Sequence, residues 1–296
     1  MKSINIKQVD AFTTIPFCGN PAAVVIDAAS ITDDEKLKIA REMNLSETAF
    51  VSPSEVADFK VQFFTPKFEV DLCGHATIGT FYALYEEKKL DLSKNIFFQE
   101  TKAGVLPVEL ADINGEKVFM MTQPSPKFQP IDMDKKNIAK LIGLSENDLI
   151  DISAMKVNTG LCWLVFGVKS LDKLMNAKLD LRAIEEISRK YNVIGITPFC
   201  LKTLNEKYSY HMRASAPIAG VVEDPVCGTG NGCVASYIIH NKLIECNDSV
   251  NLIGEEGHEV NRPGCAYVTI SKLHDEINEI KIGGTAVTVL NGNLIF

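Results

Sequence analysis

Two segments of the chain repeat one short pattern, in which an acidic residue stands four places before a Cys-Gly pair and an apolar run follows. The first copy spans Glu69 to Gly74 and the second spans Glu223 to Gly228. The two cysteines, Cys73 and Cys227, are separated by about half of the 296 residues. Because a chain of this length has room for two domains of ordinary size, the repeat predicts two similar domains that each present one thiol.

The apolar run after each Cys-Gly pair is typical of a helix buried within a sheet. Residues 76–85 and 233–240 are apolar around most of a helical circumference, whereas a surface helix is apolar on one face only. Strand-like segments surround both runs. A doubly wound parallel sheet would need a helix after nearly every strand. We therefore expect an α+β fold, mostly antiparallel, with one buried helix in each half.

A proline-rich stretch at residues 123–130 is suited to a domain boundary. We place the domains at residues 1–126 and 127–296, and the last strands of the second can pack back on the N-terminal half. Thr32 and Glu35 form a capping-box pattern that predicts a helix through about Met43. A further helix is expected at residues 181–191.

The charge of the chain limits its partners. The net charge is −8 and the sequence contains no dense run of Lys or Arg, so nucleic acid and anionic membranes are not expected as the main partner. A small molecule is the expected partner. The first residues lack the apolar core of a signal peptide, and no apolar run approaches the roughly 20 residues that cross a bilayer. We therefore expect a cytoplasmic protein.

Eight cysteines are present, and without a signal peptide they are expected to stay reduced. Cys162 and Cys200 lie in apolar, strand-like runs and are interpreted as small core residues. Structural zinc usually requires Cys-x2–4-Cys or His-x3–5-His spacing, which the chain lacks. No metal site is therefore predicted.

Both Cys73 and Cys227 precede a predicted helix N-terminus, where free N–H groups and the helix dipole favour a thiolate and lower a thiol pKa. The same N–H groups could bind a substrate carboxylate, and the glycines after each cysteine let the backbone approach it. Two such thiols could remove a proton from one face of a Cα–H and return it to the other. The alternative is that both are core cysteines and that the glycines only turn the chain.

Three other side chains are candidates for acid/base chemistry. Glu47 stands where a predicted helix gives way to an apolar strand, so it could be a carboxylate with a raised pKa in an apolar pocket, or simply an exposed loop residue. His75 could orient the Cys73 thiolate, transfer a proton or cap the helix. Asp224, next to Pro225, could be a turn residue.

At these residues the chain resembles the phenazine-biosynthesis isomerase-like family, whose fold is shared with diaminopimelate epimerase. The resemblance implies two pseudo-symmetric, epimerase-like domains, each a barrel-like sheet around a central helix, with the active site in the cleft between them. It also implies no metal or organic cofactor, and commonly a homodimer. The matching segments run nearly end to end: Val9-Asp-Ala-Phe12, Phe17-Cys-Gly-Asn-Pro-Ala-Ala-Val24, Asn44-Leu-Ser-Glu-Thr-Ala-Phe50, Cys73-Gly-His-Ala-Thr77, Asn158-Thr-Gly160 and Glu223-Asp-Pro-Val-Cys-Gly228.

The resemblance also implies roles for single residues. In the phenazine enzyme a motif acid shifts a proton along a dihydro-hydroxyanthranilate skeleton, helped by a His and an Asp, and these fall on Glu47, His75 and Asp224. In the epimerase relatives the acid/base pair is two cysteines, which fall on Cys73 and Cys227. The second cysteine departs from the phenazine pattern. Substrate contacts are expected from residues near these groups: Asn20, Gly74, Ala76, Thr77, Gly228, Thr229 and Gly230.

The sequence thus carries two sets of catalytic candidates. Both describe a cofactor-independent isomerase acting on a small carboxylate substrate. The cysteine pair favours racemisation or epimerisation of an amino-acid-like substrate, and Glu47 favours an allylic 1,3-proton shift. Two alternatives from other classes are a non-catalytic ligand-binding protein and a redox sensor with a reversible Cys73–Cys227 disulfide.

Overall fold

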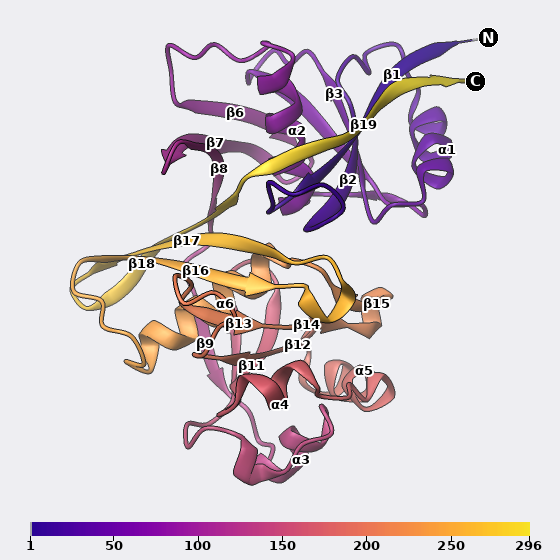
Figure 1. Cartoon of the computed structure of the whole chain (residues 1–296). Helices are drawn as coiled ribbons and strands as arrows, with labels where there is room; N and C mark the ends of the chain where they lie inside the picture. The colour runs from indigo at the N-terminus through magenta and orange to yellow at the C-terminus, as the bar shows by residue number, and fades with distance from the viewer. Residues whose placement is uncertain (1) are drawn as a thin grey trace. The chain divides into compact units, whose positions relative to one another are not determined.

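The computed structural model describes residues 2–296, which separate into two compact units. The first unit runs to Met121 and resumes at Gly283–Phe296, and the second is Thr122–Ile282 (Figure 1). This division concerns compactness alone, and the boundary expected between residues 126 and 127 stays a prediction.

The first unit is a mostly antiparallel sheet around one helix. Strand β1 (Ser3–Ala11) pairs antiparallel with both β2 (Asn20–Val25) and β19 (Ala286–Ile295), and β2 pairs parallel with β3 (Thr48–Ser52). Helix α2 (Gly74–Glu86) packs against all four of these strands. The predicted buried helix after Cys73 is therefore confirmed.

Packing on nearly every side explains the composition of α2. Its residues from Ala76 to Phe81 are all buried. Gly79 faces strand β1, because a Cβ built on it would lie 3.5 Å from the side chain of Val9. Cys73 is the N-cap, with extended backbone angles of φ −141° and ψ 123°. The helix thus begins immediately after the thiol, as expected.

The second unit repeats this plan. Strand β11 (Cys162–Gly167) pairs antiparallel with β10 (Met155–Asn158) and parallel with β12 (Gly195–Cys200). Strand β16 (Ser249–Glu256) pairs antiparallel with β17 (Gly264–Leu273). Helix α6 (Gly228–His240) packs against all five of these strands and is buried from Gly230 to Ile239.

Helix α6 begins earlier than its apolar pattern predicts. It spans Gly228–His240, so the glycine-rich run forms its first turns. A Cβ on Gly232 would lie 2.1 Å from Oε1 of Gln123, and one on Gly230 would lie 3.1 Å from Thr197. The glycines therefore allow neighbouring segments to approach the helix closely. Helix propensity depends on local sequence alone, so it does not predict these contacts.

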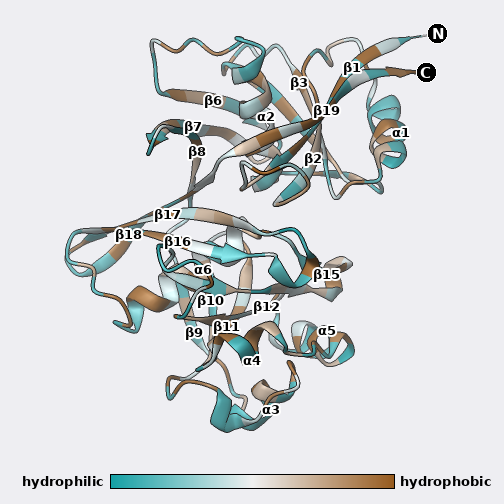
Figure 2. Cartoon of the chain, in the orientation of Figure 1, coloured by the Kyte–Doolittle hydropathy of each residue, from teal (hydrophilic) through white to brown (hydrophobic). Residues whose placement is uncertain are grey.

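Two outer helices are amphipathic. Helix α1 (Asp33–Met43) starts with the predicted capping box, in which Thr32 and Glu35 exchange hydrogen bonds, and it ends at Asn44 in the left-handed region. Helix α5 (Leu181–Tyr191) buries Ile184 and Ser188. Figure 2 shows hydrophilic and hydrophobic residues mixed along both helices, as expected for elements with one solvated face.

The α+β fold class is confirmed, because strands form most of each unit and each surrounds one buried helix. The sequence did not predict the short helices α3 and α4. No helix within residues 2–296 is both long and apolar enough to span a membrane. The remaining elements are β4 (Phe59–Phe64), β5 (Glu69–Val70), β6 (Ile96–Thr101), β7 (Gly104–Ile113), β8 (Glu116–Gln123), β9 (Lys127–Pro130), α3 (Lys135–Lys140), η1 (Glu146–Asp148), α4 (Leu171–Met175), β13 (Tyr210–Met212), β14 (Ala214–Ala216), η2 (Pro217–Ala219), β15 (Val221–Asp224), η3 (His258–Val260) and β18 (Glu276–Gly284).

Candidate active site

Three of the candidate side chains meet at the start of α2. His75 Nε2 lies 3.2 Å from Oε2 of Glu47. Sγ of Cys73 lies near both ring nitrogens, 3.5 Å from Nδ1 and 3.9 Å from Nε2. The Ser46 hydroxyl lies 3.3 Å from His75 Nε2. The structure therefore brings Glu47, His75 and Cys73 into one compact cluster.

The backbone fixes this arrangement from two elements. Glu47 immediately precedes strand β3, and its carbonyl oxygen accepts the N–H of Ala23 in β2. Cys73 and His75 are held by the first turn of α2, where Thr77 donates from both its N–H and its hydroxyl to the carbonyl of Cys73. The start of strand β3 thus positions Glu47, and the start of helix α2 positions Cys73 and His75.

The charges of the cluster favour a carboxylate beside an imidazolium. Burial acts to raise the pKa of Glu47, but the hydrogen bond and charge of His75 outweigh it, so the pKa is lowered. Burial acts to lower the pKa of His75, but contact with Cys73 and Glu47 holds it well above its usual value. The directions of the two pKa shifts therefore favour an ionised Glu47 beside a protonated His75.

Two expectations about pKa values were wrong. The pKa of Glu47 is lowered and not raised, because His75 lies beside the carboxylate. The sequence gives no sign of this contact. Cys73 does not have a lowered pKa either: burial, followed by the charge of Glu47, raises it. A helix N-terminus lowers a thiol pKa only when desolvation does not exceed its effect.

The expected substrate contacts of the first unit differ in accessibility. A Cβ on Gly74 would meet no atom within 4 Å, so the backbone there is open. The side chains of Ala76 and Thr77 are buried, and the Thr77 hydroxyl is already used within the helix. Asn20 is also buried, at the start of β2.

The second cysteine occupies the same position in its own unit. Cys227 is the N-cap of α6, and its Sγ accepts the N–H of Gly230 at 3.3 Å. Thr229 lies beside it, with Oγ1 3.7 Å from the sulfur, and this hydroxyl accepts a hydrogen bond from Nε1 of Trp163. Gly228 accepts a bond from Gln123 through its carbonyl oxygen. Burial, then the charges of Asp224 and Glu256, raise the pKa of Cys227 well above its usual value, so the expected lowering is wrong here too.

The sequence did not single out Glu256, which is fully buried behind Cys227. Its Oε2 accepts both the N–H of Cys227 and a bond from Nδ2 of Asn231. Asn231 in turn donates to the carbonyl of Cys227 and accepts from the hydroxyl of Tyr210. Burial, reinforced by the charge of Asp224, raises the pKa of Glu256 well above its usual value. The only available sequence signal was an acidic pair at the end of an apolar strand.

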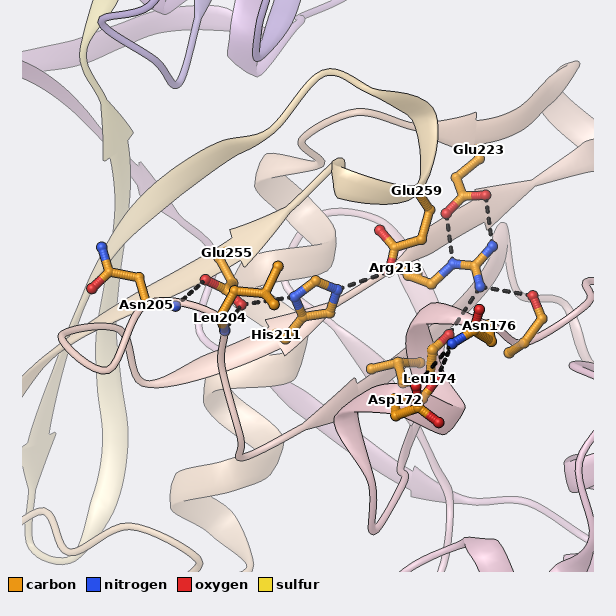
Figure 3. A network of polar contacts seen from close by, with 11 residues as sticks. Asp172, Leu174, Asn176, Leu204, Asn205, His211, Arg213, Glu223, Glu255 and Glu259 are labelled. Atoms are coloured by element: carbon orange, nitrogen blue, oxygen red, sulfur yellow. Dashed lines mark hydrogen bonds and ion pairs between the residues drawn. The ribbon is translucent and has the colours of Figure 1, made fainter.

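A second polar network surrounds Glu255, the neighbour of Glu256 at the C-terminal end of strand β16. Figure 3 shows His211 between two glutamates, with Nδ1 2.9 Å from Glu255 and Nε2 2.9 Å from Glu259. Glu255 also accepts the backbone N–H groups of Leu204 and Asn205. Burial opposes protonation of His211, but the two carboxylates outweigh it and raise the pKa to about 9.

The acidic residue that opens the second copy of the sequence pattern has a structural partner. Glu223 accepts two bonds from Arg213, at 2.6 Å from Nε and 2.8 Å from Nη2 (Figure 3). Arg213 Nη1 donates to the carbonyls of Leu174 and Ala177. In the first copy, Glu69 accepts a bond from Gln62. Both acids therefore hold strands beside the cysteine.

Glu47, Cys73 and His75 are also residue types that bind metals. Among residues 2–296, they form the one group of three such side chains whose ligand atoms all lie within 4.8 Å of one another. The sequence predicts no metal site, and the absence of a resident metal stays a prediction.

Comparison with known proteins identifies the family. The phenazine biosynthesis-like (PhzC-PhzF) family matches residues 9–292. The chain belongs to this family. An uncharacterized isomerase of Clostridium acetobutylicum is 35% identical over 100% of this chain and 99% of its own length. A crystal structure of a PhzF-family phenazine biosynthesis protein from Bacillus anthracis superposes with a TM-score of 0.93, at 36% identity, and each chain is covered fully.

A relative with a named reaction is more distant. The trans-2,3-dihydro-3-hydroxyanthranilate isomerase of Pseudomonas fluorescens is 28% identical over 98% of this chain and 99% of its own length. The family and the names of its members make the present protein an isomerase. The resemblance stated from the sequence motifs is thus confirmed.

Proposed function

We propose that the protein is a cofactor-independent isomerase that moves a proton within a small carboxylate substrate, and that Glu47 and His75 are its acid/base pair. The observation that supports this most directly is the distance of 3.2 Å between His75 Nε2 and Glu47 Oε2, beside the open backbone of Gly74. Such a pair can accept a proton at one substrate atom and return it at another.

The charge state of the pair limits the substrate class. Because the pKa of Glu47 is lowered, its carboxylate is a weak base. It can remove a proton only from a carbon acidified by a neighbouring unsaturated group. An allylic C–H, as in the dihydro-hydroxyanthranilate that the Pseudomonas relative is named for, meets this requirement. In the proposed 1,3-shift Glu47 takes the proton from one carbon and the double bond moves. The Glu47 carboxyl group, which is partly exposed and exchanges its proton with solvent, then protonates the other end of the allylic system.

The substrate carboxylate would bind at the N-terminus of α2. The first turn of a helix presents free N–H groups and a positive partial charge. Gly74 leaves that backbone uncovered, and the His75 imidazolium adds a positive charge next to it. This is the expected role of the Cys73-Gly-His75 segment in binding.

Deuterium exchange tests the proposal. The protein is incubated in D2O with cyclohexadienyl carboxylates, and loss of ring C–H signals is followed by NMR for wild type, Glu47→Gln and His75→Gln. Glu55→Gln is the matched control, because Glu55 is an exposed acid of the same unit. We expect exchange in the wild type and the control, and a loss of at least about 100-fold in both cluster variants. Equal exchange rates in wild type and Glu47→Gln would refute the assignment.

A second candidate reaction is racemisation or epimerisation at an amino-acid Cα by Cys73 and Cys227. The observation that favours it is their equivalence: each is the N-cap of a buried helix of 13 residues. Amino acids and hydroxyprolines in the same exchange assay separate the two reactions. Cα exchange that is lost in both Cys73→Ser and Cys227→Ser would support the thiol pair.

A ligand-binding protein without turnover would show no exchange at all. A redox sensor would instead form a Cys73–Cys227 disulfide in mild oxidant.

The remaining expectations are also part of the proposal. The substrate is the expected partner, without nucleic acid or a membrane, and we expect a cytoplasmic homodimer. Size-exclusion chromatography with light scattering tests the oligomeric state.

A further inference from the structure

We propose that the cluster of Glu47, Cys73 and His75 binds a zinc ion reversibly and that zinc thereby inhibits the enzyme. The inference rests on the proposed function in one respect only: inhibition requires that Glu47 and His75 carry the proton transfer. Binding of zinc itself requires only the three side chains, and the Cys73 thiol and the His75 imidazolium release their protons to solution when the ion binds.

The identity of the ligand atoms selects zinc. A cysteine sulfur, an imidazole nitrogen and a carboxylate oxygen are the three ligand types that zinc uses in proteins. Calcium and magnesium prefer sites made of oxygen atoms. The thiol and the imidazole therefore disfavour these two ions.

The distances match the edges of a zinc coordination sphere. With Zn–S of about 2.3 Å and Zn–N and Zn–O of about 2.0 Å, tetrahedral geometry separates sulfur from nitrogen by about 3.5 Å and nitrogen from oxygen by about 3.3 Å. In the structure, His75 Nε2 lies 3.9 Å from Cys73 Sγ and 3.2 Å from Glu47 Oε2. All three ligand atoms lie within 4.8 Å of one another.

Glu47 contributes an oxygen that faces the ring nitrogen. Its Oε2 lies 3.2 Å from His75 Nε2, and a metal ion between these two atoms would replace their ion-pair contact. The side chains of Glu47 and His75 remain 18% and 12% exposed, so solvent reaches the cluster.

The number of ligands predicts the kind of site. Structural zinc sites are closed by four protein ligands, whereas three ligands leave a position open to water or to another small ligand. The cluster supplies three, so the ion should exchange with solution and be removed by a chelator. While bound, it would occupy the Glu47 oxygen and the His75 nitrogen that the proposed reaction needs.

Direct binding tests the site without substrate. Zinc is titrated onto the full-length, chelator-treated protein in competition with a chromophoric chelator, and cobalt is added in parallel as a spectroscopic probe. We expect one strong equivalent in wild type, and affinity at least tenfold weaker in Cys73→Ser, His75→Gln and Glu47→Gln. Cobalt should give a thiolate charge-transfer band that Cys73→Ser lacks. Cys246→Ser is the control, because this half-buried thiol lies in the other unit, and it should bind as wild type does.

Each result decides the proposal. Equal zinc affinity in wild type and Cys73→Ser, with both folded by circular dichroism, would overturn it, as would loss of binding in Cys246→Ser. The second arm adds zinc to the exchange assay, where exchange should stop and return with chelator. Zinc that binds at the cluster while exchange continues would overturn the inhibition. Failure of the proposed function would give a different result. Proton exchange would then be as fast in Glu47→Gln as in wild type, while zinc would still bind to the cluster.

Discussion

Glu256 accepts the backbone N–H of Cys227 at 2.9 Å, so a fully buried carboxyl group holds the residue that starts α6. The same oxygen, Oε2, accepts a bond from Asn231 at 3.0 Å, and Asn231 binds the Cys227 carbonyl. Both backbone polar groups of Cys227, its N–H and its carbonyl, are therefore held by hydrogen bonds. Burial and the charge of Asp224 raise the pKa of Glu256 well above its usual value, which favours its neutral form.

The raised pKa of Glu256 predicts that neutral glutamine replaces it better than leucine does. Glu256→Gln keeps a carbonyl oxygen for both donors, so it should lower the free energy of unfolding by about 1–2 kcal/mol less than Glu256→Leu does. Glu256→Leu leaves two buried N–H groups without a partner and should cost about 2–5 kcal/mol. Urea denaturation of the three proteins measures this difference. A glutamine variant as unstable as the leucine variant would mean that the carboxylate charge is required.

The His211 network predicts that stability falls as the pH rises. His211 is fully buried, faces Glu255 and Glu259, and has the ring of His258 at 5.7 Å. Its folded pKa of about 9 lies above its ordinary value of 6.5, so its contribution is complete below pH 6.5 and is lost as the pH rises through about 9. Between pH 6.5 and 8, this loss should be about 2 kcal/mol.

The variant His211→Gln isolates this effect. Its unfolding free energy should be lower than that of wild type at pH 6.5, and the difference should shrink towards pH 8, below the range where free thiols titrate. His274→Gln is the control, because His274 is exposed, and it should follow the wild-type curve. A constant difference between wild type and His211→Gln across this range would contradict the prediction.

The Arg213–Glu223 pair predicts a large difference between two similar substitutions. Arg213 makes two bonds to Glu223 and two to backbone carbonyls, and its side chain is 6% exposed. A lysine cannot reproduce this fork, so Arg213→Lys should cost about 2–4 kcal/mol. Arg189→Lys, in an exposed i,i+4 pair with Glu185 on α5, should cost less than about 0.5 kcal/mol. Equal costs in thermal or urea denaturation would show that Glu223 is not the source of the stability.

Local patterns predicted much of the fold because they act over a few residues. The capping box of Thr32 and Glu35 and the apolar run after Cys73 each specify an element without distant partners, and both helices formed as expected. The start of α6 was misjudged, because Gly230 and Gly232 are needed for contacts with Thr197 and Gln123, which are distant in sequence.

Three of the candidate side chains lie together as a cluster, but the sequence did not predict their charges. Glu47, Cys73 and His75 were all candidates, and the structure brings them together. The direction of the Glu47 pKa depends on an imidazole that the sequence separates from it, so burial alone gave the wrong sign. Glu256 carried no local signal of its contact with Cys227. A contact between residues this far apart in sequence can be recognised only once the pairing of the strands is known.

The opposite pKa shifts of Glu47 and His75 predict a broad pH optimum for proton exchange. Glu47 titrates below its ordinary value of 4.5, so the basic carboxylate is lost only in acid. His75 titrates above its ordinary value of 6.5, so the imidazolium persists past neutrality. The rate of exchange at saturating substrate should therefore be flat from about pH 5 to pH 7 and fall on both sides.

In His75→Gln the alkaline limb should disappear, and the acid limb should move to higher pH because Glu47 loses the cation that lowers its pKa. Rates measured in D2O buffers for wild type, His75→Gln and the control Glu55→Gln test this. An acid limb that stays in place in His75→Gln would show that His75 does not set the pKa of the base.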